Sequence, residues 1–326
     1  MKLSILGGGR WGVALSLHLG KLNHQVLVYD RNQDTVKEIN RGNHPYMKGI
    51  KLKGVEATTS LKDIERYSDY VIIALPVQAI REVIQGLDLS QKVVISASKG
   101  LEIGTYKRVS QIVKEVHSSA KVFCLSGPSF ASEVSKGLPT ALVLAGEDTD
   151  QMKKIRDLFF SENFRIYLST DMVGVELGGA LKNVVAIACG ISDGLGYGEN
   201  ARASLITRGL AEMVRIGVKL GAKRETFYGL SGMGDLFLTA SSPQSRNRTF
   251  GFLIGKGESA QMAFKEIGQV VEGAYTVRAV KKLSEELSIY APISCAVYEV
   301  IIENKNIQEV VKSLLLRPPK EEFEVL

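Results

Sequence analysis

Lys182 is the residue whose surroundings most directly suggest chemistry. It lies inside the apolar stretch VELGGALKNVVAIA, whose spacing predicts a helix, and it has no carboxylate one turn before or after it in that helix. Loss of hydration on such a face lowers the pKa of an amine toward the range useful for proton transfer. We therefore expect Lys182 to exchange a proton with a substrate, Gly178 and Gly179 to leave room for it, and Asn183 to offer it an amide. The alternative is a lysine that extends its ammonium group to solvent.

A second polar cluster follows in SGMGDLFLTASSPQSRNR, where a glycine-rich turn leads to Asp235 and then to Ser245, Arg246, Asn247 and Arg248. Asp235 either caps the helix that begins there or orients a catalytic lysine and adjusts its pKa. Arg246 and Asn247 together can grip a phosphate monoester, because guanidinium and amide groups donate several hydrogen bonds. The alternative for this basic stretch is a solvated helix start.

Two more stretches place polar groups directly after predicted strands. ISASKGLE puts Lys99 at the end of one strand, and LSGPSFASEV puts Gly127, Pro128 and Ser129 at the end of another. In open α/β sheets, ligands bind at the carboxyl ends of the strands, so both stretches are candidate ligand sites. Lys99 could instead be a solvated loop lysine. Ser129 is expected to be the N-cap of the next helix, and a helix start of this kind also binds anions or hydroxyls.

The stretch SILGGGRWGVAL carries a binding motif. Gly7, Gly9 and Gly12 form G-x-G-x-x-G between a predicted strand and a predicted helix, and the next strand ends at Asp30. The glycines allow a tight turn, close approach to a pyrophosphate and packing of the helix on the strand, respectively. Asp30 suits the ribose hydroxyls of NAD, whereas Arg31 can accept the 2′-phosphate of NADP, so the choice between them stays open, with acceptance of NADP(H) favoured. The alternative is a glycine-rich turn without a ligand.

These groups need elements that hold them in place. Apolar, β-branched runs alternate with helix-like stretches through the first half, which predicts a mainly parallel sheet with helices on both faces. The runs are KLSILG, QVLVYD, DYVIIAL, KVVISAS, KVFCLSG, TALVLAG and FRIYLS. After about Asp171 only helical patterns follow. The sequence therefore predicts an α/β chain: an N-terminal Rossmann-type, doubly wound dinucleotide-binding domain over residues 1–171, and a C-terminal all-α domain over residues 172–326.

Composition narrows the possible partners. The net charge is +6, and the basic residues are spread along the chain, which favours small anionic ligands over nucleic acid. The 3 cysteines and 4 histidines have no spacing typical of a disulfide framework or a metal site, so no metal is expected. No apolar run approaches the ~20 residues needed to cross a bilayer, and the N-terminus lacks the pattern of a signal peptide. We therefore expect no membrane span and a cytoplasmic protein.

These motifs, in this order and spacing, give the chain a near full-length resemblance to the bacterial-type NAD(P)-dependent glycerol-3-phosphate dehydrogenases. The motifs that carry the resemblance are GGGRWGVAL, SASKGLE, SGPSFASEV, ELGGALKNVVAIACGISDGL, GLSGMGDLFLT, SRNR and VVEGAYT. The resemblance implies an oxidoreductase that uses NADP(H) and/or NAD(H) to interconvert dihydroxyacetone phosphate and sn-glycerol 3-phosphate. It further implies a cytoplasmic role in glycerophospholipid biosynthesis and a homodimer in which the helical domain carries much of the contact, besides binding substrate.

The resemblance also implies roles for individual residues. Lys182 looks like the proton donor and acceptor at the reacting oxygen, with Lys99 and Asp235 as its catalytic companions. Together with the residues argued above, the predicted substrate-binding positions are Lys99, Gly127, Ser129, Lys182, Asn183, Asp235, Ser245, Arg246 and Asn247. The predicted cofactor-binding positions are Gly7, Gly9, Arg10, Trp11, Gly12, Asp30, Arg31, Lys99, Ala131, Arg246, Val270 and Glu272.

Two other functions remain as alternatives. Another dehydrogenase with a Rossmann domain and a helical domain, of the 3-hydroxyacyl-CoA or 6-phosphogluconate type, would share the predicted architecture. The hydroxyacyl type is expected to use a His–Glu pair, but all 4 histidines precede the helical half of the chain. A non-catalytic NAD(P)-sensing protein would keep the glycine motif but would not need Lys182, Asp235 and Arg246 together.

Overall fold

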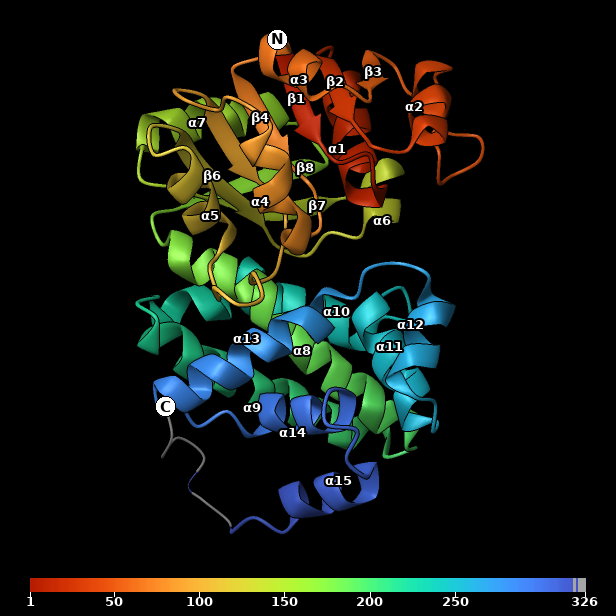
Figure 1. Ribbon diagram of the computed structural model, residues 1–326, viewed down its shortest axis with the longest axis vertical. Coiled ribbons are helices and arrows are strands. Elements are labelled where there is room, and N and C mark those ends of the chain that lie inside the picture. Colours follow the sequence, from red (N-terminus) through yellow and green to blue (C-terminus); the bar gives the residue numbers. More distant parts are fainter. Residues whose placement is uncertain (319–320, 322–326) are drawn as a thin grey trace. The chain divides into compact units, whose positions relative to one another are not determined.

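The computed structural model describes residues 1–318 and 321 of the chain (Figure 1). The chain divides into two compact units. Unit 1 consists of Met1–Ser98 and Val109–Met172, and unit 2 consists of Lys99–Arg108 and the chain from Val173 onward. The last residues of the predicted C-terminal domain, 319–320 and 322–326, lie outside the described residues.

Unit 1 is built on a sheet of 8 strands in the order β3-β2-β1-β4-β5-β6-β7-β8. Every neighbouring pair is parallel except β6 and β7, which are antiparallel. The strands are β1 (Lys2–Leu6), β2 (Gln25–Tyr29), β3 (Val55–Thr58), β4 (Tyr70–Ile73), β5 (Val93–Ser96), β6 (Lys121–Ser126), β7 (Thr140–Ala145) and β8 (Phe164–Ser169). The strand order reverses between β1 and β4, which is the switch point where doubly wound sheets bind ligands.

Helices cover both faces of this sheet, as the alternation of buried side chains along a strand shows. On β2, Val26 and Val28 belong to one core together with α1, α2, α6 and α7, whereas Leu27 belongs to a second core with α3, α4 and α5. The helices are α1 (Arg10–Lys21), α2 (Gln33–Asn40), α3 (Leu61–Tyr67), α4 (Val77–Gln85), α5 (Val109–Val116), α6 (Ala131–Ser135) and α7 (Thr149–Phe159).

The predicted fold class is confirmed: unit 1 is a doubly wound, mainly parallel α/β structure, and unit 2 is helical. All seven predicted runs form strands. The sequence did not predict β3, a strand of only 4 residues whose alternate side chains are exposed. Such a short segment carries too few apolar positions to stand out from a loop.

Unit 2 is organised around one long helix, α8, whose two sides pack into separate cores. Leu181, Val185 and Cys189 pack with α9, α10 and α13, whereas Val184 and Ile187 pack with α11, α12, α14 and α15. The elements are α8 (Met172–Gly194), α9 (Gly198–Lys219), the 3₁₀ turn η1 (Arg224–Tyr228), the π-helical turn η2 (Leu230–Gly234), α10 (Asp235–Ser241), α11 (Arg246–Gly255), α12 (Ala260–Ile267), α13 (Glu272–Glu286), α14 (Pro292–Ile301) and α15 (Ile307–Leu315).

The apolar character of α8 has a structural explanation. In the described part of the chain, α8 is the one helix long and apolar enough to cross a membrane by length and composition, so the expectation that no segment reaches this length was wrong. However, 89% of its apolar window is buried inside the protein. The helix is apolar on all sides because it is surrounded by other helices.

The segment Lys99–Arg108 belongs to unit 2, although it follows a strand of unit 1. Leu101 is 1% exposed and Tyr106 is partly buried, and both pack into the unit 2 core formed by α8, α9 and α13. Arg108 pairs with Glu176 of α8 at 2.5 Å. This placement brings Lys99 to the helical unit, which its position after a strand did not indicate.

Candidate active site

The glycine-rich loop of unit 1 has the geometry of a pyrophosphate cradle. Gly7 follows β1 with φ of +115°, a conformation that other residues rarely adopt. A Cβ on Gly12 would overlap the carbonyl oxygen of Gly7, whereas a Cβ on Gly9 would meet nothing within 4 Å. Gly9 is also the N-cap of α1, and no side chain caps that helix start. The backbone N–H groups there and the open space at Gly9 fit the pyrophosphate of a dinucleotide.

Several side chains of unit 1 fix this loop and its surroundings. The Tyr46 hydroxyl donates a hydrogen bond to the carbonyl oxygen of Gly8 at 2.8 Å, and the Arg10 guanidinium lies over the Tyr46 ring at 5.4 Å from its centroid. Asp30 directly follows β2, which ends one residue earlier than predicted, and it accepts a hydrogen bond from the backbone N–H of Asn32 at 2.7 Å. The sequence analysis missed Tyr46, since no motif connects a loop tyrosine with a glycine 38 residues earlier.

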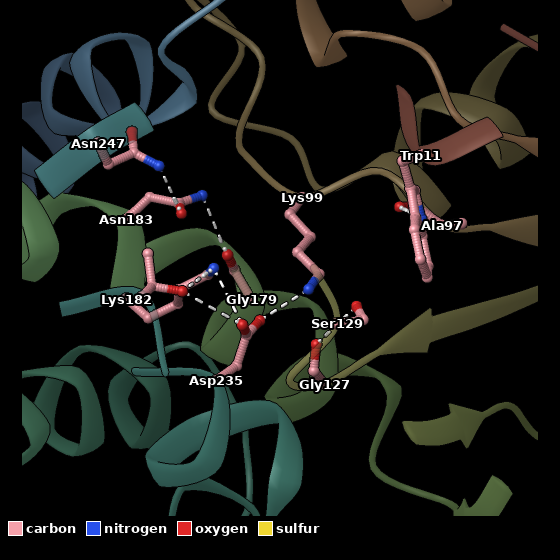
Figure 2. A network of polar contacts seen from close by, with 11 residues as sticks. Trp11, Ala97, Lys99, Gly127, Ser129, Gly179, Lys182, Asn183, Asp235 and Asn247 are labelled. Carbon is pink, nitrogen blue, oxygen red and sulfur yellow. Dashed lines mark hydrogen bonds and ion pairs between the residues drawn. The ribbon is translucent and has the colours of Figure 1, made fainter. Parts of the chain in front are cut away.

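Two further cofactor candidates of unit 1 are Trp11, within the glycine motif, and Arg31, which follows β2. Trp11, in the first turn of α1, donates a hydrogen bond from its indole N–H to the carbonyl oxygen of Ala97 at 3.2 Å (Figure 2). Arg31 is exposed and follows Asp30 directly. Both positions are compatible with contacts to a dinucleotide held by the loop.

The turn after β6 differs from its predicted form. Gly127 has φ of +137°, and its carbonyl oxygen accepts a hydrogen bond from the Ser129 hydroxyl at 3.1 Å (Figure 2). The N-cap of α6 is Phe130, without a side-chain hydrogen bond, so the prediction that Ser129 caps this helix was wrong. The hydroxyl is used inside the turn because the helix begins one residue later than predicted, at Ala131.

In unit 2, Asp235 joins two lysines that are far apart in the sequence (Figure 2). One carboxylate oxygen accepts from Lys99 Nζ at 2.7 Å, and the other accepts from Lys182 Nζ at 3.0 Å. The side chains of Lys182 and Asp235 are 8% and 2% exposed, respectively, and that of Lys99 is 19% exposed. Asp235 is the first residue of α10, and its carboxylate is directed at the lysines instead of capping the helix.

Burial sets the protonation of this cluster. It lowers the pKa of Lys182 from 10.5 to about 8, because the low-dielectric interior disfavours the ammonium; the Asp235 carboxylate opposes this shift, and the positive charges of Lys99 and Arg246 add to it. Burial also acts to raise the pKa of Asp235, but the two lysines outweigh it and hold the pKa of that carboxyl below its usual value. Lys182 can therefore exchange a proton near neutral pH while Asp235 stays ionised.

Thr239 completes the environment of the Lys182 ammonium. Its hydroxyl oxygen accepts a hydrogen bond from Lys182 Nζ at 2.6 Å, and the hydroxyl lies 3.3 Å from the Asp235 carboxylate. The sequence analysis missed Thr239. Its spacing of four residues after Asp235 was a usable signal, since residues one helical turn apart share a face.

Gly178, before Lys182, serves a different purpose from the predicted one. A Cβ on Gly178 would lie 2.6 Å from the carbonyl oxygen of Ser231 in η2, so protein backbone occupies the space that was predicted to receive a ligand. The carbonyl oxygen of Gly179 accepts a hydrogen bond from the Asn183 amide at 3.3 Å. Gly178 therefore lets η2 approach α8 closely, which places Asp235, the next residue after η2, against Lys182.

A second polar chain links three helices of unit 2. The Asn183 side-chain oxygen accepts from the Asn247 amide at 2.9 Å (Figure 2), and the Asn247 side-chain oxygen accepts from the backbone N–H of Gly273 at 2.9 Å. These residues belong to α8, α11 and α13. The chain fixes the start of α11 against the helix that carries Lys182.

The remaining predicted residues of unit 2 lie at helix starts. Ser245 caps α11 by accepting a hydrogen bond from the backbone N–H of Arg248, and Arg246 is the first residue of that helix and is exposed. Val270 and Glu272 lie at the start of α13. A helix start with an arginine and a buried asparagine is well suited to an anion such as a phosphate.

The chain matches two family models, described as the N-terminus and the C-terminus of NAD-dependent glycerol-3-phosphate dehydrogenase, over residues 2–152 and 171–312. Among curated proteins, it is 45% identical to a glycerol-3-phosphate dehydrogenase (NAD(P)+) of Thermoanaerobacter sp., with 99% of each chain covered. It is 42% identical to one of Clostridium acetobutylicum, with 98% of each chain covered. Among solved structures, glycerol-3-phosphate dehydrogenase from Coxiella burnetii matches with a TM-score of 0.92 at 37% identity, covering 97% of this chain and 99% of that one.

Proposed function

The chain belongs to the NAD-dependent glycerol-3-phosphate dehydrogenase family, and from that premise we propose how its residues perform the reaction. The protein is an NAD(P)-dependent oxidoreductase that reduces dihydroxyacetone phosphate to sn-glycerol 3-phosphate, which is used to make glycerophospholipids. The resemblance noted in the sequence is confirmed, and the two alternative functions are not favoured.

The dinucleotide is proposed to bind at the glycine-rich loop of unit 1. The open space at Gly9 and the uncapped start of α1 would receive the pyrophosphate, with Asp30 and Arg31 toward the adenosine ribose. The other proposed contacts are Gly7, Arg10, Trp11, Gly12, Lys99, Ala131, Arg246, Val270 and Glu272. When bound, NAD(P)H supplies the hydride that reduces C2 of the substrate.

Lys182 is proposed to supply the proton at the carbonyl oxygen on C2. As negative charge develops on that oxygen, the ammonium stabilises it and then transfers a proton to it. The observation that carries this role is the buried ammonium held between Asp235 and Thr239, with a pKa of about 8. Asp235 keeps the amine in place, and Lys99 holds the other carboxylate oxygen and keeps positive charge beside the developing alkoxide.

The phosphate of the substrate is proposed to bind at the start of α11. Arg246 would pair with the phosphate and Asn247 would donate to it from its second amide N–H, while its first holds Asn183. Ser245, Asn183, Gly127 and Ser129 are the other proposed substrate contacts. A phosphate gripped away from the reacting carbon helps to fix C2 for hydride transfer.

A homodimer in the cytoplasm completes the proposal. Support for the dimer comes from an apolar groove of about 550 Å³ in unit 2, lined by residues of α8, α9, α14 and α15. Leu315, which lines the groove, and the next residue, Leu316, are 75% and 71% exposed, and exposed apolar residues that continue an apolar groove are typical of a surface covered by another protein chain. All 3 cysteines are free thiols, as is typical of a reducing compartment. The mass of the protein in dilute solution tests the dimer.

The reaction and the role of Lys182 can be tested in one assay. The nicotinamide absorbance is followed with dihydroxyacetone phosphate and either NADPH or NADH, for the wild type and for Lys182→Ala. We expect the variant to be slower by ~100-fold or more, because a general acid is removed. Lys281→Ala is the control, since Lys281 forms an ion pair with Glu285 on α13 away from the cluster. Full activity of Lys182→Ala would contradict the proposed mechanism, and the ratio of the two cofactors tests Arg31.

A further inference from the structure

Helices α8 and α11 cross so closely that their backbones touch. A Cβ on Gly190 would overlap the carbonyl oxygen of Arg248, and a Cβ on Gly251 would overlap that of Ile187. Gly194 and Gly255 make the same kind of contact one turn further along. We call these four residues, Gly190, Gly194, Gly251 and Gly255, the glycine interlock. It leaves no layer of side chains between the two helices, so their relative position has little freedom.

The side chain of Asp193 holds the first turn of α11 to the same end of α8. Its carboxylate accepts from Arg248 Nε at 2.9 Å and Nη2 at 2.7 Å, and from Arg202 Nη1 at 3.1 Å. The Asp193 side chain is 7% exposed. A carboxylate in the last turn of a helix faces the negative end of the helix dipole, and α8 has no basic residue there to offset it. Asp193 is therefore stabilised by the two guanidinium groups, and only the one of Arg248 connects it to α11.

Arg248 is thus fixed twice, through its backbone on Gly190 and through its side chain on Asp193. It lies two residues after Arg246 in the same helical turn. Since the Arg248 guanidinium is engaged by Asp193, the two arginines of the SRNR stretch have different proposed roles: Arg248 anchors the turn, and Arg246 is the one proposed to contact the ligand.

We propose that Asp193 is a positioning residue for phosphate binding, acting through Arg248 to hold Arg246 and Asn247 in place. This inference depends on the proposed role of Arg246 in gripping the substrate phosphate. Asp193 itself is not one of the proposed substrate contacts. It is a buried residue of α8 that pairs with Arg202 of α9 and Arg248 of α11.

Electrostatics and positioning predict opposite effects for one substitution. Asp193→Asn removes a negative charge near an anion site, so a purely electrostatic effect would strengthen the binding of phosphate. If Asp193 acts by positioning, the same substitution releases Arg248, lets the first turn of α11 shift, and weakens phosphate binding. The sign of the change therefore separates the two explanations.

The experiment measures the inhibition constant of inorganic phosphate, competing with dihydroxyacetone phosphate in the full-length enzyme. We expect Asp193→Asn to raise this constant and to lower kcat/KM for dihydroxyacetone phosphate by roughly tenfold or more, because small displacements at a binding group are costly. The KM for NADH is expected to change less than kcat/KM for dihydroxyacetone phosphate, because Arg246 is only one of the proposed dinucleotide contacts and the others do not depend on Asp193. Unchanged or tighter binding of phosphate by Asp193→Asn overturns the inference.

Arg202 provides a matched control. Arg248→Met and Arg202→Met each remove one guanidinium from the same carboxylate, but only Arg248 belongs to α11. We expect the first to weaken phosphate inhibition. The second should leave it within about twofold of the wild type, because the loss of Arg202 destabilises the protein without releasing α11 from Asp193. Equal effects of the two variants overturn the inference, since they would show a general requirement for the ion pairs.

Two further variants keep the outcome interpretable. If Asp193→Asn does not fold, Arg248→Lys replaces it, because it keeps the positive charge but loses the paired N–H geometry; unchanged phosphate inhibition in that variant overturns the inference. Arg246→Ala tests the proposed function on its own. If Arg246→Ala leaves phosphate inhibition intact, the proposed phosphate contact of Arg246 is wrong. If Arg246→Ala weakens phosphate inhibition but Asp193→Asn does not, only the positioning role of Asp193 is rejected.

Discussion

The glycine-rich loop of unit 1 and the glycine interlock of unit 2 use the same residue type for different physical purposes. At Gly9 a side chain would enter open space within reach of a helix start, whereas at Gly251 it would overlap a backbone carbonyl oxygen of α8. The loop keeps space free for a ligand, and the interlock removes space between two helices. A glycine beside a functional residue therefore says little about its purpose until the atoms around its missing Cβ are known.

The consequence is a division between binding and stability. Substitutions in the loop at positions facing open space should affect ligand binding and leave folding intact. Substitutions in the interlock should affect folding first, and substrate binding through the position of α11. Gly178 belongs with the interlock in this respect, since backbone of η2 occupies its open side.

The largest expected effect is on stability, from Gly251→Ala. The added methyl group overlaps the carbonyl oxygen of Ile187, so one of the helices must move. Overpacking of this kind costs about 1–3 kcal/mol, and a backbone obstacle places this site at the upper end. Alanine regains up to about 1 kcal/mol through its better helix propensity, so we expect the free energy of unfolding to fall by about 2 kcal/mol. Denaturant unfolding measures it.

Gly229→Ala is the control for this prediction. Gly229 has a negative φ, and a Cβ there would lie 3.4 Å from the nearest atom, the carbonyl oxygen of Thr226. Its stability should stay close to that of the wild type. The affinity of folded Gly251→Ala for NADH should fall less than its affinity for substrate, since the glycine-rich loop lies in unit 1 and Arg246 is the one proposed dinucleotide contact on α11. A Gly251→Ala protein as stable as the wild type would contradict this prediction, since it would show that α8 and α11 can move apart with little loss of folding free energy.

The next largest effect is expected in the pH dependence of the reaction rate, which Lys182 in unit 2 should control. Reduction of dihydroxyacetone phosphate requires protonated Lys182, whose pKa of about 8 lies below the usual value because of burial. The rate of reduction should therefore fall as pH rises through about 8, by about tenfold for each further pH unit. The rate of glycerol 3-phosphate oxidation should instead rise until the pH reaches about 8, because oxidation requires the neutral amine. The pH dependence of kcat/KM in both directions measures this, because kcat/KM reports the pKa of the free enzyme.

The affinity for NADH, measured over the same pH range, should behave differently from the reaction rates. The loop presents backbone N–H groups, which do not titrate, so the dissociation constant of NADH should stay flat where the rates change. A reduction rate that is constant from pH 7 to pH 9.5 would argue against Lys182 as the proton donor.

The sequence allowed correct prediction of features that depend on local spacing. The turn at Gly7, the presence of a helix after the glycine motif and the burial of Lys182 each follow from residues within one turn or one strand. The contact of Asp235 with a lysine was one of two alternatives left open, because the sequence places a carboxylate after a glycine-rich turn but does not say which way it faces.

Features that depend on distant backbone could not be predicted in this way. Gly190 and Gly194 have the four-residue spacing of close helix packing, but nothing in the sequence identifies α11 as the partner. Gly178 was predicted to make room for a ligand, and only the position of η2 corrects this. Lys99 follows a strand, and its placement in unit 2 depends on the burial of Leu101 and on the Arg108–Glu176 pair, which are long-range contacts.

The smallest effect, and the sharpest test of the comparison, is expected from Gly9→Ala. Its methyl group meets no protein atom within 4 Å, and its φ of −70° is accessible to alanine, so stability should change by less than about 1 kcal/mol. The methyl group would, however, stand where the backbone must approach a pyrophosphate, and we expect the dissociation constant of NADH to rise roughly tenfold, about 1.4 kcal/mol. Gly12→Ala is the counterpart within the same motif: its methyl group overlaps Gly7, so it should lose stability as well as affinity. If Gly9→Ala binds NADH as the wild type does, the open space at Gly9 is not where the cofactor lies, and the loop would then resemble the interlock in using its glycines for packing alone.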